Sequence, residues 1–442
     1  MDPRLRGSGV YGRSGVSDTV KADRGRLRSI IGGSAGNLVE WYDWYVYSAF
    51  TLYFAPVIFP KGSATAQLLS AAAVFAVGFL MRPIGAWAMG VYSDRHGRKA
   101  GLTLSVTLMC VGSLIIAVTP TYAAAGLVAP AMLVFARMLQ GLSVGGEYGA
   151  SATYLSEMAG RDRRGYYASW QYVTLIGGQL TALAVLLILQ AVLSEAALEA
   201  WGWRVPFAIG GLLAVVVFRI RRGLLETESF RNVGEKGRSS GLALFREHPR
   251  EAWTVMALTA GGTLAFYAYT TYMQKFLVNT GRFDRETASR IMTAALLLYA
   301  AVQPLAGALS DRVGRKPLLV GFGVLGVLGT VPLFMALERV ASPVLAFLLI
   351  AAALVTLSGY TAISGVLKAE MFPAHIRTLG VALPYAIANT AFGGTAEYVA
   401  LWLKDQGVER WFYGYVTAMI AVSLVAYLRM PDTKANSRIV ED

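Results

Sequence analysis

Charged residues are scarce in this sequence. Only 15% of its 442 residues are Asp, Glu, Lys or Arg, against roughly 25% in an average soluble domain. The single cysteine, Cys110, excludes an internal disulfide, and the three histidines show no metal-ligand spacing. The sequence also offers no phosphate-binding glycine loop and no nucleophile–base pair. We therefore expect no metal, no organic cofactor and no enzymatic activity.

Apolar residues take the place of charge. They make up 55% of the chain, and the mean hydropathy is +0.50. Apolar runs of about 20 residues are long enough to cross a bilayer as helices. Twelve such runs are predicted, over 29–54, 66–92, 100–120, 128–154, 166–192, 205–220, 252–277, 288–310, 317–337, 344–368, 378–402 and 412–429. The sequence therefore predicts an all-α membrane protein of twelve transmembrane helices.

The charge that is present is mostly basic. There are 40 Lys and Arg against 27 Asp and Glu, a formal net charge of +13. In a soluble protein this surplus would suggest nucleic acid binding. In membrane proteins, however, Lys and Arg concentrate in cytoplasmic loops, and most of those here fall on the same side as the N-terminus. We therefore predict a multi-pass protein of the inner membrane with both termini cytoplasmic, in contact with lipid and not with nucleic acid.

A polar stretch at 221–251 divides the chain into two halves of six predicted spans. We interpret it as a cytoplasmic linker with room for a surface helix. The expected bundles are 28–220 and 252–430. Residues 1–27 lack the apolar core of a signal peptide and are predicted to form a disordered cytoplasmic tail, and 431–442 a second tail.

The two halves repeat a sequence motif. GVYSDRHGRK at 90–99 follows the second span, and GALSDRVGRK at 307–316 follows the eighth. A second pair recurs at nearly the same offset, after the fourth and tenth spans: Glu157 with Arg164, and Glu370 with Arg377. Two markers at one offset indicate a duplication. Internal repeats are typical of secondary transporters, in which one half rocks against the other.

These motifs carry a family resemblance. The G-x-x-x-D-R-x-G-R-K repeat and RMLQGLSVGGEYGAS in the fourth span resemble the major facilitator superfamily. GNLVEWYDWYVY, FLMRPIG, WGWRVPF, TTYMQKFLVNT and LKAEMFPAHIR resemble, more narrowly, its metabolite:proton symporter family, and most of all the members that carry α-ketoglutarate. The resemblance implies two pseudo-symmetric six-helix bundles, alternating access, a monomer, and protons as the coupling ion. It also implies that spans 3, 6, 9 and 12 are peripheral, and these carry no charge away from their ends.

Charges inside the predicted spans are expected to be functional or paired, since each costs about 2.5–3.5 kcal/mol at a helix centre. Glu40 and Asp43 lie on a polar stripe of the first span, and a buried carboxyl can take up and release a proton. We predict that proton coupling uses Glu40, Asp43 or Glu147, with Arg137 beside them. The alternative is a fixed ion pair of Glu40 or Asp43 with Arg137 or Arg82.

Arg82, deep in the second span, is the strongest candidate for binding an organic anion, since guanidinium binds carboxylate through two parallel hydrogen bonds. A dicarboxylate calls for a second cation, for which Lys275 is available. Lys275 lies near a predicted helix end, however, where it would equally extend to the interface, and Glu397 is expected at a solvated helix end. The remaining candidates are polar groups at helical spacing: Tyr47, Gln179, Tyr267, Gln274, Tyr385 and Asn389.

The repeated motif is predicted to form a cytoplasmic gate, in which each half holds its own charged latch. The alternative is a simple positive-inside anchor at a glycine turn. The predicted gate residues are Asp94, Arg95, Arg98, Asp311, Arg312, Arg315, Glu157, Arg164, Glu370 and Arg377.

Together these features favour a proton-coupled symporter that imports α-ketoglutarate. The main alternative is a symporter for another small metabolite: shikimate, citrate, or a zwitterion such as proline or betaine. A membrane receptor with this fold is disfavoured, because no signalling domain is appended.

Overall fold

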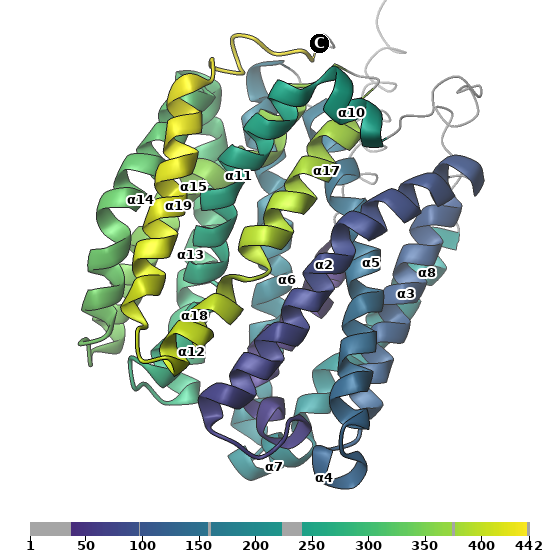
Figure 1. The fold of residues 1–442 in the computed structure, drawn as a ribbon, viewed down its shortest axis with the longest axis vertical. Helices are drawn as coiled ribbons and strands as arrows, with labels where there is room; N and C mark the ends of the chain where they lie inside the picture. Colours follow the sequence, from purple (N-terminus) through teal and green to yellow (C-terminus); the bar gives the residue numbers. More distant parts are fainter. Residues whose placement is uncertain (1–36, 97, 158–160, 223–240, 374–375, 440–442) are drawn as a thin grey trace, which may run out of the picture.

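The computed structural model describes residues 37–96, 98–157, 161–222, 241–373 and 376–439. This part of the chain is helical and contains no strand. Seven of its helical segments are long and apolar enough to cross a membrane, and one of these, Pro343–Ala369, contains a local interruption. The other spanning segments are shorter, interrupted, or adjoin residues outside the described ranges. Together they form the twelve segments of the predicted all-α membrane fold, which is confirmed (Figure 1).

In the first half each spanning segment is one continuous helix. The first covers residues 37–58. The others are α2 (Ala64–His96), α3 (Arg98–Val118), α5 (Val128–Glu157), α6 (Arg164–Val192) and α8 (Val205–Arg222). Between them lie the short α4 (Tyr122–Ala125) and α7 (Glu195–Ala200) and the 3₁₀ turns η1 (Arg161–Arg163) and η2 (Gly202–Arg204).

In the second half three of the six spanning segments are interrupted. The seventh is α11 (Pro249–Tyr269) with α12 (Met273–Asn279), and the tenth is α15 (Pro343–Thr361) with α16 (Ser364–Ala369). The eleventh joins α17 (Arg377–Ala388) to α18 (Ala396–Asp405) through a π-helical turn, η4 (Asn389–Gly393). The continuous ones are α13 (Arg285–Val313), α14 (Arg315–Leu337) and α19 (Arg410–Arg429), and α10 (Gly241–Glu247) precedes them all.

Local sequence explains where several helices begin and end. Ser194, Asp284 and Ser342 cap α7, α13 and α15 by accepting a hydrogen bond from a backbone amide three residues on. For Asp284, the hydrogen bonds from Thr287 lower the pKa of the carboxyl group. In the second copy of the repeat, α13 ends at Gly314, whose φ of 96° lies where side chains are strained. The glycine of the repeated motif is thus needed for the turn.

The two halves touch at both ends of the bundle. We call these the α10 end, where the described C-terminal residues lie, and the α7 end, where α4 and α12 lie (Figure 1). Across the interface, α6 packs against α13, and α2 packs against α17 and α18. At the α7 end, Arg285 pairs with Glu199 at 2.7 Å and with Glu195 at 3.0 Å. Central side chains are therefore enclosed from both directions.

Two predicted boundary regions look different in the structure. The segment interpreted as linker contains α10, and α11 already begins at Pro249. Residues 431–439, expected to be part of a tail, pack against the protein, and Ile439 is 5% exposed. The start of the first predicted span and the tail 1–27 lie outside the described residues.

Candidate functional site

The centre of the bundle holds a buried arginine. α2 and α5 approach each other so closely that a Cβ atom on Gly145 would lie 2.1 Å from the carbonyl oxygen of Arg82. The Arg82 side chain is 3% exposed, and its Cζ lies 4.1 Å from the Trp44 ring centroid and 4.0 Å from that of Phe79. Its Nε and Nη2 atoms have no hydrogen-bond partner among the described residues. Two charged donors are therefore available to an anion.

Polar groups of the second half lie beside this arginine. The phenols of Tyr267 and Tyr385 interact electrostatically with Arg82. Asn389, in the π-helical turn, accepts a hydrogen bond from Thr263 at 2.5 Å, whereas its Nδ2 has no partner within the described ranges. The Oε1 atom of Gln179 also has none. The helix interruption thus places a buried amide donor toward the centre, as in transporters whose discontinuous helices form the binding site.

Two predicted binding residues already use their polar groups within the protein. The Tyr47 hydroxyl donates to the carbonyl of Ala71 at 2.8 Å, and the Gln274 amide donates to Ser289 at 3.1 Å. Both side chains are at most 5% exposed. Their contacts connect neighbouring helices of one half.

An acidic network lies beside the arginine site. Asp43 accepts hydrogen bonds from the hydroxyl of Ser113 and, at 2.7 Å, from the amide of Gln140. The oxygen of the same amide accepts from Arg137 Nη1, also at 2.7 Å. Asp43 and Arg137, both at most 1% exposed, are therefore joined through Gln140 and not by direct contact. This differs from the direct pair considered as the alternative role.

The other two predicted proton-coupling acids are Glu40 and Glu147. Glu40 is 6% exposed, and its Oε1 atom accepts from the hydroxyl of Ser143 at 3.4 Å. Glu147, on α5, is partly exposed. Both take part in further interactions. Glu40 is thus buried against α5, the helix that also carries Arg137, whereas Glu147 is only partly buried.

One of the two predicted roles of Lys275 was to extend to the lipid interface. The structure instead buries this side chain. It is 1% exposed, and its Nζ lies 3.0 Å from both carboxylate oxygens of Glu397 and 2.8 Å from the hydroxyl of Ser48. The prediction of a solvated end for Glu397 is wrong, since this residue is 4% exposed. The buried pair joins α12 to α18 and connects both to the first helix.

Sequence reasoning missed a second buried lysine. Lys368, in α16, is 0% exposed and lies across the interface from Tyr148 of α5. It was overlooked because it ends a predicted span and precedes a charged motif. A signal was present: Tyr360, Ser364 and Lys368 recur every four residues, which places polar groups on one helix face within an apolar run.

The gate residues of the second half form a buried cluster at the α10 end. Asp311 accepts from the backbone amides of Gly165 and Tyr166, both at 2.8 Å, and so reaches the N-terminus of α6 in the other half. Arg315 pairs with Asp311 at 2.8 Å and with Glu370 at 3.3 Å. The cluster thus joins the halves through a carboxylate placed at a helix N-terminus, where the helix dipole favours it.

The C-terminal segment completes this cluster. Thr433 donates to Glu370 at 2.6 Å. Arg377 and Arg164 donate to the carbonyl groups of Arg438 and Ile439, at 3.1 and 3.4 Å. Arg312, by contrast, is exposed. The side chains of the remaining predicted gate residues lie outside the described part: Asp94, Arg95, Arg98 and Glu157.

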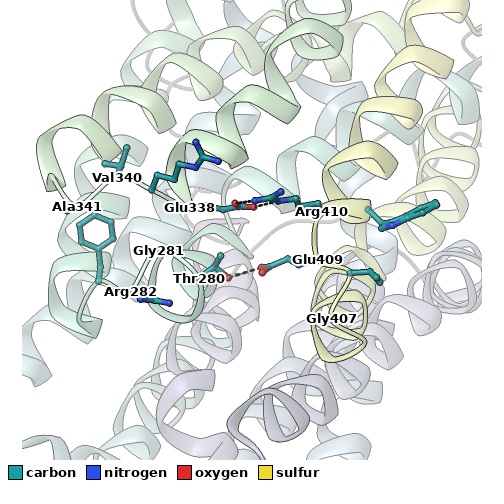
Figure 2. Close-up of a pocket in the computed structure, with 13 residues that line it drawn as sticks. Thr280, Gly281, Arg282, Glu338, Val340, Ala341, Gly407, Glu409 and Arg410 are labelled. Atoms are coloured by element: carbon teal, nitrogen blue, oxygen red, sulfur yellow. Dashed lines mark hydrogen bonds and ion pairs between the residues drawn. The ribbon is translucent and has the colours of Figure 1, made fainter.

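A surface pocket lies away from this centre. It has a volume of about 880 Å³ and is lined by the loops after α12, α14 and α18, all in the second half (Figure 2). Its two carboxylates already have partners: Glu338 pairs with Arg410 at 2.9 Å, and Glu409 accepts a hydrogen bond from the hydroxyl of Thr280 at 2.7 Å (Figure 2). The pocket has no residue from the first half, so it does not match a site enclosed between two bundles.

Comparison with known proteins defines the class. The sugar (and other) transporter family model matches residues 30–243, and the major facilitator superfamily model matches 282–441. A xylose transporter from Escherichia coli has the same fold, with a TM-score of 0.70 at 20% identity, covering 91% of this chain and 97% of that one. The chain belongs to the major facilitator superfamily. It is a multi-pass inner-membrane transporter of small molecules and not an enzyme.

Sequence identities to individual transporters show which members of the superfamily this chain resembles. The chain is 54% identical to the α-ketoglutarate permease of Escherichia coli K12 over 92% of this chain and 94% of that protein. It is 32% identical to the citrate-proton symporter of Klebsiella pneumoniae, with 90% of each chain covered. It is 31% identical to a glycine betaine/proline/ectoine/pipecolic acid transporter of Dickeya dadantii, over 95% of this chain and 86% of the other. The predicted resemblance is confirmed.

Proposed function

We propose that this protein is a proton-coupled symporter that imports α-ketoglutarate by alternating access. The observation that carries the proposal is Arg82, a buried guanidinium with two unpartnered donors between the halves of a chain 54% identical to an α-ketoglutarate permease. Two parallel donors match one carboxylate. Tyr267, Tyr385 and Asn389 supply further groups for the substrate. Protons are the coupling ion, and the protein acts as a monomer.

Charge explains why such import needs protons. α-Ketoglutarate is a dianion at neutral pH, and moving each charge against a negative-inside potential costs about 2.3 kcal/mol per 100 mV. Two protons per substrate neutralise that cost, and more would add driving force. Asp43 is the leading proton site, because Gln140 connects it to Arg137, and a shift of that amide would change the surroundings of the carboxyl group. Glu40 and Glu147, the other acids of the first and fourth spans, are the further candidates for this role.

The cluster of Asp311, Arg315 and Glu370 is the proposed cytoplasmic gate. With the Lys- and Arg-rich segments placed inside, the α10 end faces the cytoplasm. Opening toward the cytoplasm then requires Asp311 to release the amides of Gly165 and Tyr166. The paired charges of the second half favour a latch over a simple basic anchor.

Uptake by the reconstituted full chain tests the function. Proteoliposomes given labelled α-ketoglutarate are expected to accumulate it when the outside is acidified, and only to equilibrate when no gradient is imposed. Absence of uptake in both conditions would refute the proposal. Liposomes without protein provide the background.

A citrate carrier or a zwitterion carrier is the second candidate, supported by the relatives of these kinds at 32% and 31% identity. Competition separates the candidates. Excess unlabelled succinate or α-ketoglutarate should suppress labelled uptake, whereas betaine should not. Stronger suppression by citrate or by betaine would favour the second candidate.

A further inference from the structure

The second buried lysine has an unusual set of partners. Lys368 lies in α16, just after the interruption that separates α16 from α15. Its Nζ donates to the hydroxyl of Ser364 at 2.8 Å and to that of Tyr148 at 3.2 Å. It also lies 4.1 Å from the ring centroid of Tyr385, in cation–π range. All of these groups are neutral.

No anion balances this charge among the described residues. The carboxylates recorded within 4 Å of a cation there pair with other basic groups, including Glu397 with Lys275 and Glu370 with Arg315. A fully buried ammonium group without a counter-ion is costly, and buried charges in proteins are generally paired. Lys368 therefore has the properties of a binding residue whose counter-ion is supplied by a bound ligand.

The lysine and Arg82 flank the same aromatic pair. Tyr148 and Tyr385 stack with their ring centroids 3.8 Å apart and their planes at 10°. Tyr385 interacts with Arg82 as well as with Lys368. Tyr148 and Arg82 belong to the first half, whereas Tyr385 and Lys368 belong to the second. A ligand bound to both cations would span the interface between the halves.

We infer that Lys368 is the second anion-binding group of the transport site. It binds one carboxylate of a dicarboxylate, while Arg82 binds the other. The inference rests on the proposed function and deepens it, since it assigns the residue that distinguishes a dicarboxylate from a monocarboxylate. A monocarboxylate of the same length would satisfy Arg82 and leave Lys368 without an anion.

Exchange measurements test this assignment without depending on proton coupling. Proteoliposomes are loaded with unlabelled α-ketoglutarate, and entry of the labelled substrate is competed by α-ketoglutarate or by 2-oxopentanoate, which has a methyl group in place of the distal carboxylate. A hydrogen bond to a charged group is worth about 1.5–3 kcal/mol, or roughly 10- to 100-fold in affinity. The wild type is expected to prefer the dicarboxylate by this factor.

In Lys368→Met the preference should fall to about threefold or less, because α-ketoglutarate loses affinity while 2-oxopentanoate does not. Lys404→Met, which removes a lysine of α18 at the α7 end, is the matched control and should keep the wild-type preference. If Lys368→Met does not fold, Lys368→Gln gives the same comparison. Ser364→Ala keeps the ammonium group of Lys368 but removes one of its hydrogen-bond acceptors. This variant should show a preference for α-ketoglutarate over 2-oxopentanoate that is smaller than in the wild type but larger than in Lys368→Met.

The outcomes are distinguishable. If wild-type protein does not exchange α-ketoglutarate, the proposed function itself fails. If the wild type prefers the dicarboxylate and the Lys368 variants keep that preference, the assignment of Lys368 is overturned. An equal loss of affinity for both ligands also overturns it, since that result indicates a structural role.

Discussion

Two buried lysines of the second half, Lys275 and Lys368, have opposite surroundings. Lys275 has a complete set of partners within the protein, a carboxylate and a hydroxyl. Lys368 is equally buried, yet within the described part of the chain its recorded contacts are with hydroxyl groups and aromatic rings. The charge of Lys275 is neutralised by a carboxylate in this structure, whereas Lys368 has no anion among the described residues. The difference separates a cation that holds helices together from a cation available to a substrate.

This contrast shows why burial alone does not identify a binding residue. A buried ion pair such as Lys275 with Glu397 contributes little net stability, but removing one partner is strongly destabilising. A buried cation without an anion has already incurred its desolvation cost. Its loss should therefore affect ligand binding more than folding. Variants at these positions can therefore distinguish an effect on stability from an effect on binding.

The largest effect is expected from Lys275→Met. It leaves Glu397 buried without its cation, which should lower the free energy of unfolding by about 3–5 kcal/mol. Thermal unfolding of the purified protein in detergent measures the change. The double variant Lys275→Met, Glu397→Gln should recover most of the loss. Lys368→Met should destabilise much less, and a loss equal to that of Lys275→Met would erase the distinction between the two lysines.

Arg82→Lys should weaken α-ketoglutarate binding by roughly 10- to 100-fold, or about 1.5–3 kcal/mol, because a point charge replaces a planar pair of donors. The charge itself is retained, so folding should change little. Titration of substrate binding by calorimetry, beside thermal unfolding, separates the two effects. Unchanged affinity would contradict the role given to the unpartnered donors of Arg82.

Asp43 is a third case, a buried carboxylate that is linked to a cation only indirectly. Its hydrogen bond from Gln140 connects it to Arg137. Asp43→Asn keeps the shape and removes the titratable group, so unfolding should change by only about 1 kcal/mol. Accumulation driven by a pH gradient should be lost, while exchange of substrate persists. Normal accumulation in Asp43→Asn would move the proton site to Glu40 or Glu147.

The smallest effect is expected at the α10 end. Thr433→Val removes one hydrogen bond to Glu370, whose other oxygen still pairs with Arg315. A hydrogen bond of this kind is worth about 0.5–1.5 kcal/mol, so the closed gate should be slightly less stable. Initial uptake rates should change by less than about tenfold. A complete loss of transport would show that the segment is essential to the site itself.

Much of the architecture was predictable from sequence because it follows local rules. Apolar run lengths predicted twelve spans, and the glycine of the repeated motif predicted a turn, which the positive φ of Gly314 bears out for the second copy. The cost of charge in a membrane singled out Arg82 and Asp43, and the structure places both at most 3% exposed. These predictions need only neighbouring residues and the thickness of a bilayer.

The partners of those charges were not predictable, because they depend on packing between distant segments. Lys275 meets Glu397 across 122 positions of sequence. Lys368 is buried because α16 turns inward after the interruption at its start, against α5 of the other half. A sequence read span by span places both lysines at helix ends. Their different roles emerge only once the two halves are brought together.

Residues 432–439 pack against both halves of the transporter. Asp432 accepts from the backbone amides at the start of α14, Arg438 pairs with Glu251, and Ile439 packs beside Tyr148 of the first half. Because this segment contacts both halves, a small dye attached to it would report directly when the two halves part.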